Sequence, residues 1–152
     1  MSAGGVSFAD RGLDLTRGFK ALKVWMQLQA DGVAKLGRII EQNVRQAQAI
    51  ASAVEAHPSL ELLAPAPLNI VCFRYRADAL DDAALNGINE ELLLRLQERG
   101  IAVPSSTRIG GRFALRLAHV NHRTTDADME LVLRAVAEIG DELVAERGVD
   151  GS

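Results

Sequence analysis

The sequence feature that most constrains the fold is a long run from Gly32 to His57 in which apolar residues recur every three or four positions. That spacing places the apolar residues on one side of a helix. They are Val33, Leu36, Ile40, Val44, Ala47, Ala51 and Val54. Pro58 disfavours helical backbone at His57, so we expect the helix to end there. The sequence therefore predicts one amphipathic helix of unusual length.

Two polar residues are expected to cap helices before and within this region. Asp31 is expected to be the N-cap of the long helix, and Thr16 the N-cap of a preceding helix over residues 17–30. The first residues, "MSAGGVSFAD", are rich in glycine and serine. We therefore expect residues 1–15 to form a flexible lead-in.

The second half of the chain predicts short strands alternating with helices. Extended segments are expected in "SLELLA", "NIVCFRYR", "IAVPSSTRI" and "GRFALRLAHV", the last two joined by a turn at Gly110 and Gly111. One helix is expected over residues 81–100, ending at Gly100, and another from about Thr124 or Thr125, with acidic residues in its first turn. The order of elements predicts an α+β fold, a small and mainly antiparallel sheet with helices on one side.

One predicted strand contains an arginine, Arg116, with leucine on both sides. Side chains alternate between the two faces of a strand. One face carries Phe113, Leu115, Leu117 and His119, and the other carries Arg112, Ala114, Arg116 and Ala118. The first face is expected to be core. On the second, alanine is too short to cover Arg116, and a half-buried cation needs a partner. That partner is solvent, a carboxylate elsewhere in the chain, or a ligand.

Composition excludes several classes of function. The 152 residues, 48% of them hydrophobic, suit one domain with a core, and a net charge of −3 with scattered basic residues does not suggest nucleic-acid binding. Without an apolar run of membrane-spanning length or a signal peptide, we expect a soluble cytoplasmic protein without membrane contact. The single cysteine, Cys72, is expected to be a buried hydrophobe.

Few residues suggest a catalytic or metal site. The histidines are His57, His119 and His122, and the spacing in "HVNH" brings two ligands together on a helix rather than across a strand end. We therefore expect no metal. A basic stripe of Arg17, Lys20 and Lys23 beside Trp25 indicates either a solvated helix face or an interface or anion contact.

Four segments, in their order and spacing, carry a resemblance to a known family. They are "LTRGFKALKVWMQLQADGVAKLGRIIEQNV", "PAPLNIVCFRY", "NEELLLRLQERG" and "GGRFALRLAHVNHRTTDADMELVLRAV". Together they cover nearly the whole chain. They resemble the C-terminal part of the group II pyridoxal-phosphate-dependent amino-acid decarboxylases, the relatives of aromatic L-amino-acid, tyrosine and histidine decarboxylase.

The resemblance implies a domain organisation and a cofactor. In that family a long helix crosses from a large cofactor-binding domain to a small C-terminal α+β domain, which here would give a linker and long helix over residues 16–57 and the small domain over residues 58–152. The large domain supplies the lysine that binds pyridoxal phosphate, next to a histidine, and no lysine here follows a histidine. The resemblance implies an inactive fragment that binds no cofactor by itself, from a homodimeric parent acting on amino acids, with aromatic ones as the default.

The resemblance also implies roles for individual residues. Arg116 matches the arginine of the family's C-terminal strand that faces the active-site region, so its anion would be substrate, cofactor or the large domain. Thr16 matches a usually small position that approaches the neighbouring subunit's active site. Arg17, Lys20, Lys23 and Trp25 would form an interface. Gly18 departs from the family pattern, which commonly has a second arginine there. The alternative is a small regulatory, amino-acid-sensing or dimerisation module without catalysis.

Overall fold

The computed structural model describes residues 18–121 and 123–149. They divide into two compact units, one ending at Gly37 and one beginning at Arg38. The first unit contains α1 (Lys20–Asp31) and the first residues of α2 (Val33–Ala56), and the second contains the rest of the chain. The expected lead-in over residues 1–15 lies outside the described residues, and the domain limits expected from the resemblance stay a prediction.

Both predicted caps in the first part of the chain are wrong. Helix α1 begins at Lys20, and its N-cap is Phe19, which makes no side-chain cap bond, so Thr16 is not the cap. Asp31 is the last residue of α1, because Gly32 has a φ of 76° that ends the helix and separates it from α2. The Asp31 carboxylate instead pairs with Lys35, in the first turn of α2.

Helix α2 confirms the predicted long helix and its end before Pro58. In the second unit its apolar side is buried, with Ala47 and Val54 completely inaccessible to solvent. Nearer its start, Val33 and Ile40 are 74% and 63% exposed. The apolar stripe therefore continues past the end of the packed part of the helix.

The sheet has four antiparallel strands in the order β1-β2-β4-β3. The strands are β1 (Leu60–Leu62), β2 (Ile70–Tyr75), β3 (Ser105–Ile109) and β4 (Arg112–Ala118). Gly110 and Gly111 join β3 to β4 with φ values of 58° and 81°, which confirms the predicted hairpin turn. The antiparallel sheet with helices on one side is the expected fold.

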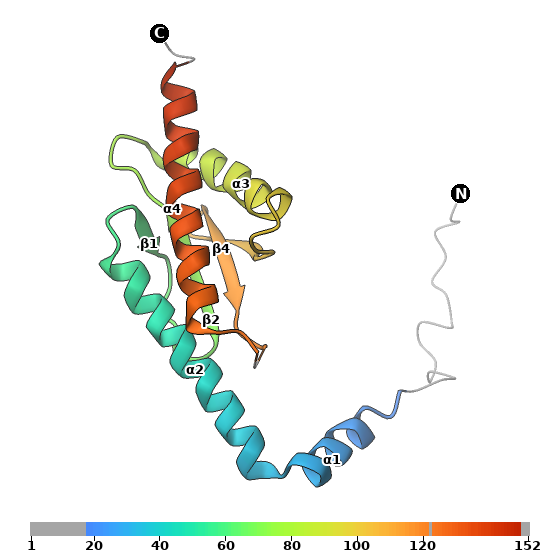
Figure 1. Ribbon diagram of the computed structural model, residues 1–152. Coiled ribbons are helices and arrows are strands. Elements are labelled where there is room, and N and C mark those ends of the chain that lie inside the picture. The colour runs from blue at the N-terminus through green and yellow to red at the C-terminus, as the bar shows by residue number, and fades with distance from the viewer. Residues whose placement is uncertain (1–17, 122, 150–152) are drawn as a thin grey trace, which may run out of the picture. The chain divides into compact units, whose positions relative to one another are not determined.

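Three helices cover one face of this sheet. Figure 1 shows α4 (Asp126–Val149) crossing in front of β2 and β4, with α3 (Asp82–Glu98) and α2 on either side of it. The face beneath them carries Phe73 and Leu115, which are opposite each other in register and completely buried. The apolar stripe predicted for α3, Leu85, Ile88, Leu92 and Leu96, packs into the same core. The alternation read from the strands is therefore confirmed.

The ends of the last two helices also confirm the predictions. Helix α3 stops before Gly100, which has a φ of 66°. At the start of α4, the Thr125 Oγ1 accepts from the Asp128 backbone N–H at 3.3 Å, and the Thr125 N–H donates to the Asp128 carboxylate at 2.8 Å. This reciprocal pair satisfies backbone groups that the first helical turn leaves free.

Two asparagines of α3 complete the sheet where β2 and β4 separate. The last paired residues of the two strands at that end are Phe73 and Leu115. One step further, Asn89 accepts from the Tyr75 N–H at 2.8 Å and donates to the Tyr75 carbonyl at 3.0 Å, while Asn86 accepts from the Phe113 N–H at 2.6 Å. Asn89 is completely buried. The amide side chains thus replace the missing ladder hydrogen bonds.

Candidate functional site

Arg116 lies on β4 with its side chain on the face of the sheet opposite the helices. Its neighbours in register are Cys72 on β2 and Ser105 on β3. The Arg116 Nη1 donates to the Ser105 hydroxyl at 3.3 Å, and that hydroxyl donates to the Arg116 carbonyl at 3.2 Å. The arginine is half-buried, and the flanking alanines differ, because Ala114 is completely buried while Ala118 is exposed.

Arg116 differs electrostatically from the other arginines that are buried or half-buried in the described residues. Arg74 pairs with Glu61 and Asp82, and Arg112 pairs with Glu61. Arg95 pairs with Glu91 and Glu146. Arg116 has no carboxylate within ion-pair distance among the described residues. Of the three sources named from the sequence, an internal carboxylate therefore finds no support.

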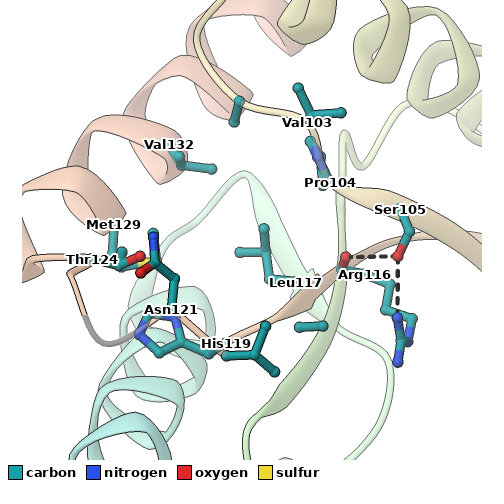
Figure 2. A pocket seen from close by; sticks show the side chains of 13 residues that line it. Val103, Pro104, Ser105, Arg116, Leu117, His119, Asn121, Thr124, Met129 and Val132 are labelled. Atoms are coloured by element: carbon teal, nitrogen blue, oxygen red, sulfur yellow. Dashed lines mark hydrogen bonds between the residues drawn. The ribbon is translucent and has the colours of Figure 1, made fainter. Parts of the chain in front are cut away.

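A pocket of about 270 Å³ lies next to Arg116. Figure 2 shows Arg116 and Ser105 at one end of this pocket and Asn121 and Thr124 at the other, with Met129 and Val132 along the α4 side. The lining combines one cation, a few hydrogen-bonding groups and apolar side chains. Such a lining suits a small molecule or a protein segment that carries a negative charge beside an apolar group.

His119 is on the core side of the same pocket, as its place in the strand alternation predicted. It is only 5% exposed, and its Nε2 lies 2.8 Å from the Gln46 Oε1. Since that amide oxygen can only accept, the Nε2 carries the proton in the neutral ring. Burial lowers the pKa of His119, and the nearby Asp126 carboxylate opposes that shift. His119 is therefore held as a neutral hydrogen-bond donor.

Gln46 of α2 forms hydrogen bonds with the end of β4 and with the start of α4 at this end of the sheet. Besides contacting His119 at the end of β4, its Nε2 donates to the Thr124 carbonyl at 3.1 Å and to the Asp126 carboxylate at 2.9 Å. The helix α2 is thereby fixed to the loop that leads into α4. Neither Gln46 nor Ser105 stands out in the sequence, since their partners are 73 to 80 and 11 residues away, respectively. For Ser105, the hairpin register opposite Arg116 was the available signal.

The other predicted site residues lie in the first part of the chain. Thr16 and Arg17 are outside the described residues, and so, much later in the chain, is His122. Lys20, Lys23 and Trp25 are on α1 in the first unit, and each is exposed, Trp25 by 58%. Arg116 belongs to the second unit.

The lysines of this chain do not fit a covalently bound aldehyde cofactor. Such a cofactor needs a lysine held inside a pocket among groups that orient it. The sequence has three lysines, and all are on exposed positions, two on α1 and one in the first turn of α2. Nor do the described residues contain a cluster of His, Cys, Asp and Glu side chains able to hold a metal ion. In the same residues, every helix is too short or too polar to cross a membrane.

Known proteins match this chain in sequence. The conserved region described as "Pyridoxal-dependent decarboxylase conserved domain" matches residues 4–76. The aromatic-L-amino-acid decarboxylase of Bacillus atrophaeus is 30% identical over 141 residues, which are 92% of this chain and 29% of that protein. Tryptophan decarboxylase 1 of Oryza sativa subsp. japonica is 37% identical over 113 residues, 72% of this chain and 22% of that protein. The chain thus spans less than a third of the length of these relatives.

Solved structures match the fold. The Oryza sativa TDC, crystallised with PLP and tryptamine, superposes with a TM-score of 0.76 at 30% identity, over 84% of this chain and 28% of that one. The glutamate decarboxylase domain of a two-activity enzyme from Vibrio parahaemolyticus superposes with a TM-score of 0.73 at 32% identity, over 84% of this chain. The proteins that match in sequence and those that match in structure are therefore of the same kind, since all are named as decarboxylases.

Proposed function

Because the chain belongs to the group II pyridoxal-phosphate-dependent amino-acid decarboxylases, we propose that it forms the C-terminal part of such an enzyme. The enzyme is a carboxy-lyase acting on an amino acid, with aromatic amino acids as the first candidates, because the matched relatives include aromatic-L-amino-acid and tryptophan decarboxylases. A cytoplasmic homodimer is the proposed state of the whole protein. By this proposal, the chain corresponds to a part of the enzyme that does not carry the cofactor lysine.

The observation that carries this proposal is the half-buried Arg116, which has no carboxylate partner among the described residues. A cation in that position keeps its hydration or meets an anion from outside. In the proposed enzyme that anion belongs to the substrate, the cofactor or the large domain. Thr16 is proposed to approach the neighbouring subunit's active site, and Arg17, Lys20, Lys23 and Trp25 to form an interface.

The chain by itself is proposed to be inactive and to bind no pyridoxal phosphate. The aldehyde can condense with any amine, but a lasting and specific bond needs a lysine in a pocket that orients the ring. The exposed lysines of α1 and α2 provide none.

A reduction experiment tests the inactivity. The 152-residue chain is mixed with pyridoxal phosphate, reduced with borohydride and mapped by mass spectrometry. We expect no stoichiometric adduct at a single lysine, and the Bacillus atrophaeus relative treated in parallel serves as the positive control. One defined adduct accompanied by decarboxylation would contradict the proposal.

A hybrid enzyme tests the assignment to the family's C-terminal part. Residues 18–152 replace the matching segment of the Bacillus atrophaeus enzyme, and cofactor absorbance and decarboxylation are measured. We expect an active hybrid, in which Arg116→Ala weakens cofactor or substrate handling by about 1.5 to 3 kcal/mol, the range for a charge-assisted hydrogen bond. A folded hybrid without cofactor binding would argue against the assignment.

The pocket beside Arg116 favours one alternative, a small amino-acid-sensing module without catalysis. Its volume of about 270 Å³ and its single cation would suit a free amino acid. In that case amino acids at millimolar concentration should raise the melting temperature of the isolated chain. The decarboxylase proposal expects no such shift.

A further inference from the structure

A groove lies between α2 and α4, which are neighbours in Figure 1. Its volume is about 230 Å³, and every residue that lines it belongs to one of these two helices. A second hollow of about 360 Å³ adjoins it and shares Gln46, Ala49 and Asp126 with it. Together they have room for a small molecule. Arg116 lines neither of them, so the groove is a different candidate site from the pocket described above.

The floor of the groove is apolar, and small residues keep it open. Ile50 and Leu133 line it and are 3% and 8% exposed, so they present the edge of the core to the groove. Ala49 and Ala53 lie on the same side of α2 as Ile50, and both are exposed. Because a methyl group is short, these two positions leave the floor accessible, and the apolar group of a ligand can be buried there.

The α4 side of the groove is acidic. Asp126 and Glu130 both line it and are exposed, and their spacing of four positions places them one turn apart on the same side of the helix. Asp126 accepts a hydrogen bond from the Gln46 amide at 2.9 Å. Glu130 is in the second turn of α4, where the positive end of the helix has little effect on a bound cation.

This negative charge is not balanced by a neighbouring cation within the part of the chain that the structure describes. There, neither Asp126 nor Glu130 forms an ion pair, and no lysine or arginine lines the groove. Arg45 lines only the adjoining hollow and is not within ion-pair distance of Asp126. The groove therefore offers two carboxylates beside an apolar floor.

The ligand that complements this groove is an amine with an apolar group and without a carboxylate. The reaction of the proposed enzyme makes such a molecule: the bond between Cα and the carboxylate breaks, carbon dioxide leaves, and a proton takes its place on Cα. The product keeps the ammonium group. The substrate still carries its carboxylate, which Asp126 and Glu130 repel. The charge of the groove therefore favours the product over the substrate.

We propose that the groove between α2 and α4 binds the amine product of the decarboxylase, with the ammonium group at Glu130 and Asp126 and the apolar group against Ile50 and Leu133. The choice of ligand rests on the proposed function. An ion pair at exposed carboxylates is weak, so binding needs both the charge and the apolar contact. A ligand that contacts both helices also stabilises their packing.

Three probes that share one aromatic ring test the ligand preference. Phenethylamine carries only an ammonium group, 3-phenylpropionate carries only a carboxylate, and phenylalanine carries both. Their binding to the 152-residue chain is measured by saturation-transfer difference NMR, which observes the ligand. We expect a Kd on the order of 1 mM for phenethylamine. The two probes with a carboxylate should bind at least about tenfold more weakly.

Two variants test whether the amine lies in the groove. Glu130→Gln removes a charge and Ala53→Leu fills the floor, and each is expected to weaken phenethylamine binding by at least about fivefold. Glu138→Gln and Ala56→Leu are the matched controls, since they change exposed positions of the same helices that do not line the groove. Both controls should leave binding unchanged, and circular dichroism checks that all four variants keep the fold.

Three results would overturn the proposed site. The first is phenethylamine binding that neither Glu130→Gln nor Ala53→Leu weakens, because the amine would then lie elsewhere. The second is phenylalanine binding as tight as that of phenethylamine and equally weakened by Glu130→Gln, because the groove would then not distinguish product from substrate. The third is an affinity for phenethylamine that rises as the chain is diluted, because a second copy of the chain would then occupy the groove.

The outcomes also separate this inference from the proposed function, because binding is measured without the reaction. A hybrid enzyme that decarboxylates, together with a chain that does not bind phenethylamine, overturns the groove and leaves the proposed function standing. Binding of phenethylamine that depends on Glu130 and Ala53, together with a folded hybrid that binds no cofactor, supports an amine site in the groove and counts against the proposed function.

Discussion

Arg74 and Arg116 project from neighbouring strands to the same face of the sheet but have opposite surroundings. The Arg74 side chain is 5% exposed, and its Nε and Nη2 donate to Glu61 at 2.7 Å and to Asp82 at 2.8 Å. Among the described side chains, only that of Ser105 forms a hydrogen bond with the Arg116 side chain. One arginine is thus part of the fold, and the other is available to a partner.

Replacing each arginine with alanine should therefore affect the free energy of unfolding to a different extent. Arg74→Ala is expected to lower the free energy of unfolding by about 3 kcal/mol, because it leaves the half-buried Glu61 short of one partner. Arg116→Ala is expected to change it by less than about 1 kcal/mol, since a hydrated side chain loses little. Urea denaturation of the isolated chain measures both. A loss of several kcal/mol for Arg116→Ala would show that this arginine is structural.

His119 should make stability depend on pH. Burial holds its folded pKa below the ordinary histidine value of about 6.5, so the unfolded chain binds a proton that the folded chain does not. The free energy of unfolding is then expected to fall as the pH decreases from about 6.5 towards the lower folded pKa. Above about pH 6.5 the contribution of His119 to stability is fully present. His119→Gln, which keeps a polar side chain facing Gln46, should remove this part of the slope in denaturation curves recorded across the window. An unchanged slope would show that His119 does not cause it.

At the scale of elements, α4 packs tightly on the sheet at Gly140. The Tyr75 ring of β2 lies against it, and a Cβ at this position would be 2.1 Å from the ring. The Tyr75 hydroxyl donates to the next residue, Asp141, at 2.7 Å. Helix and strand can be this close only because residue 140 has no side chain.

Two glycine replacements test this packing. Gly140→Ala is expected to destabilise the chain by at least about 2 kcal/mol, because both α4 and Tyr75 are held in place by the core. Gly37→Ala is the control, since an added Cβ there meets nothing within 4 Å, and alanine in a helix interior should stabilise by about 0.5 to 1 kcal/mol. Thermal unfolding followed by circular dichroism compares the two. Equal effects would contradict the close packing at Gly140.

The elements could be predicted from the sequence because their signals are local. The three- and four-residue spacing of apolar residues predicted α2 and α3, the alternation of side chains predicted β2 and β4, and the two glycines predicted the hairpin turn. What failed or was missed depends on distant parts of the chain. Asn89 reads as a polar helix residue until β2, 14 positions earlier, is placed beside it. The prediction that Asp31 is an N-cap failed because the break between the two helices lies at Gly32, one residue later, so Asp31 is the last residue of α1.

Only part of the candidate site could be predicted from the sequence. Arg116 stood out because a cation between two leucines on a strand violates the usual pattern, and within the described part of the chain no carboxylate pairs with it. Ser105, Gln46 and the pocket they border depend on the sheet register and on how α2 packs, which no short stretch of sequence contains. The family came from the order and spacing of whole segments rather than from any single residue.

At the scale of the whole molecule, the first unit exposes a large apolar surface. Every described residue of α1 is at most partly covered, and Phe19, Trp25 and Met26 are 70%, 58% and 56% exposed. Exposed apolar surface of this kind favours association. In the isolated chain, this apolar surface is therefore available for contacts with other copies.

The isolated chain should therefore self-associate. We expect a dimer or larger assembly in light scattering, and Trp25→Glu should shift it towards monomer by placing a charge in the apolar contact. Leu94→Glu, at an exposed position on α3, is the control and should leave the assembly unchanged. A strict monomer at high concentration for the unaltered chain would count against this prediction.

The strand order has a consequence for how such assemblies are built. The sheet ends in β1, which has three residues, and in β3, which has five and presents Ser105, Ser106 and Arg108 as exposed side chains. Free strand edges are templates for amyloid-like growth, and short edges with polar and charged residues resist the addition of a further strand. Assemblies of this chain should consequently keep the circular dichroism of the monomer and bind no amyloid dye, because they grow through helices and leave the hydrogen bonding of the sheet unchanged.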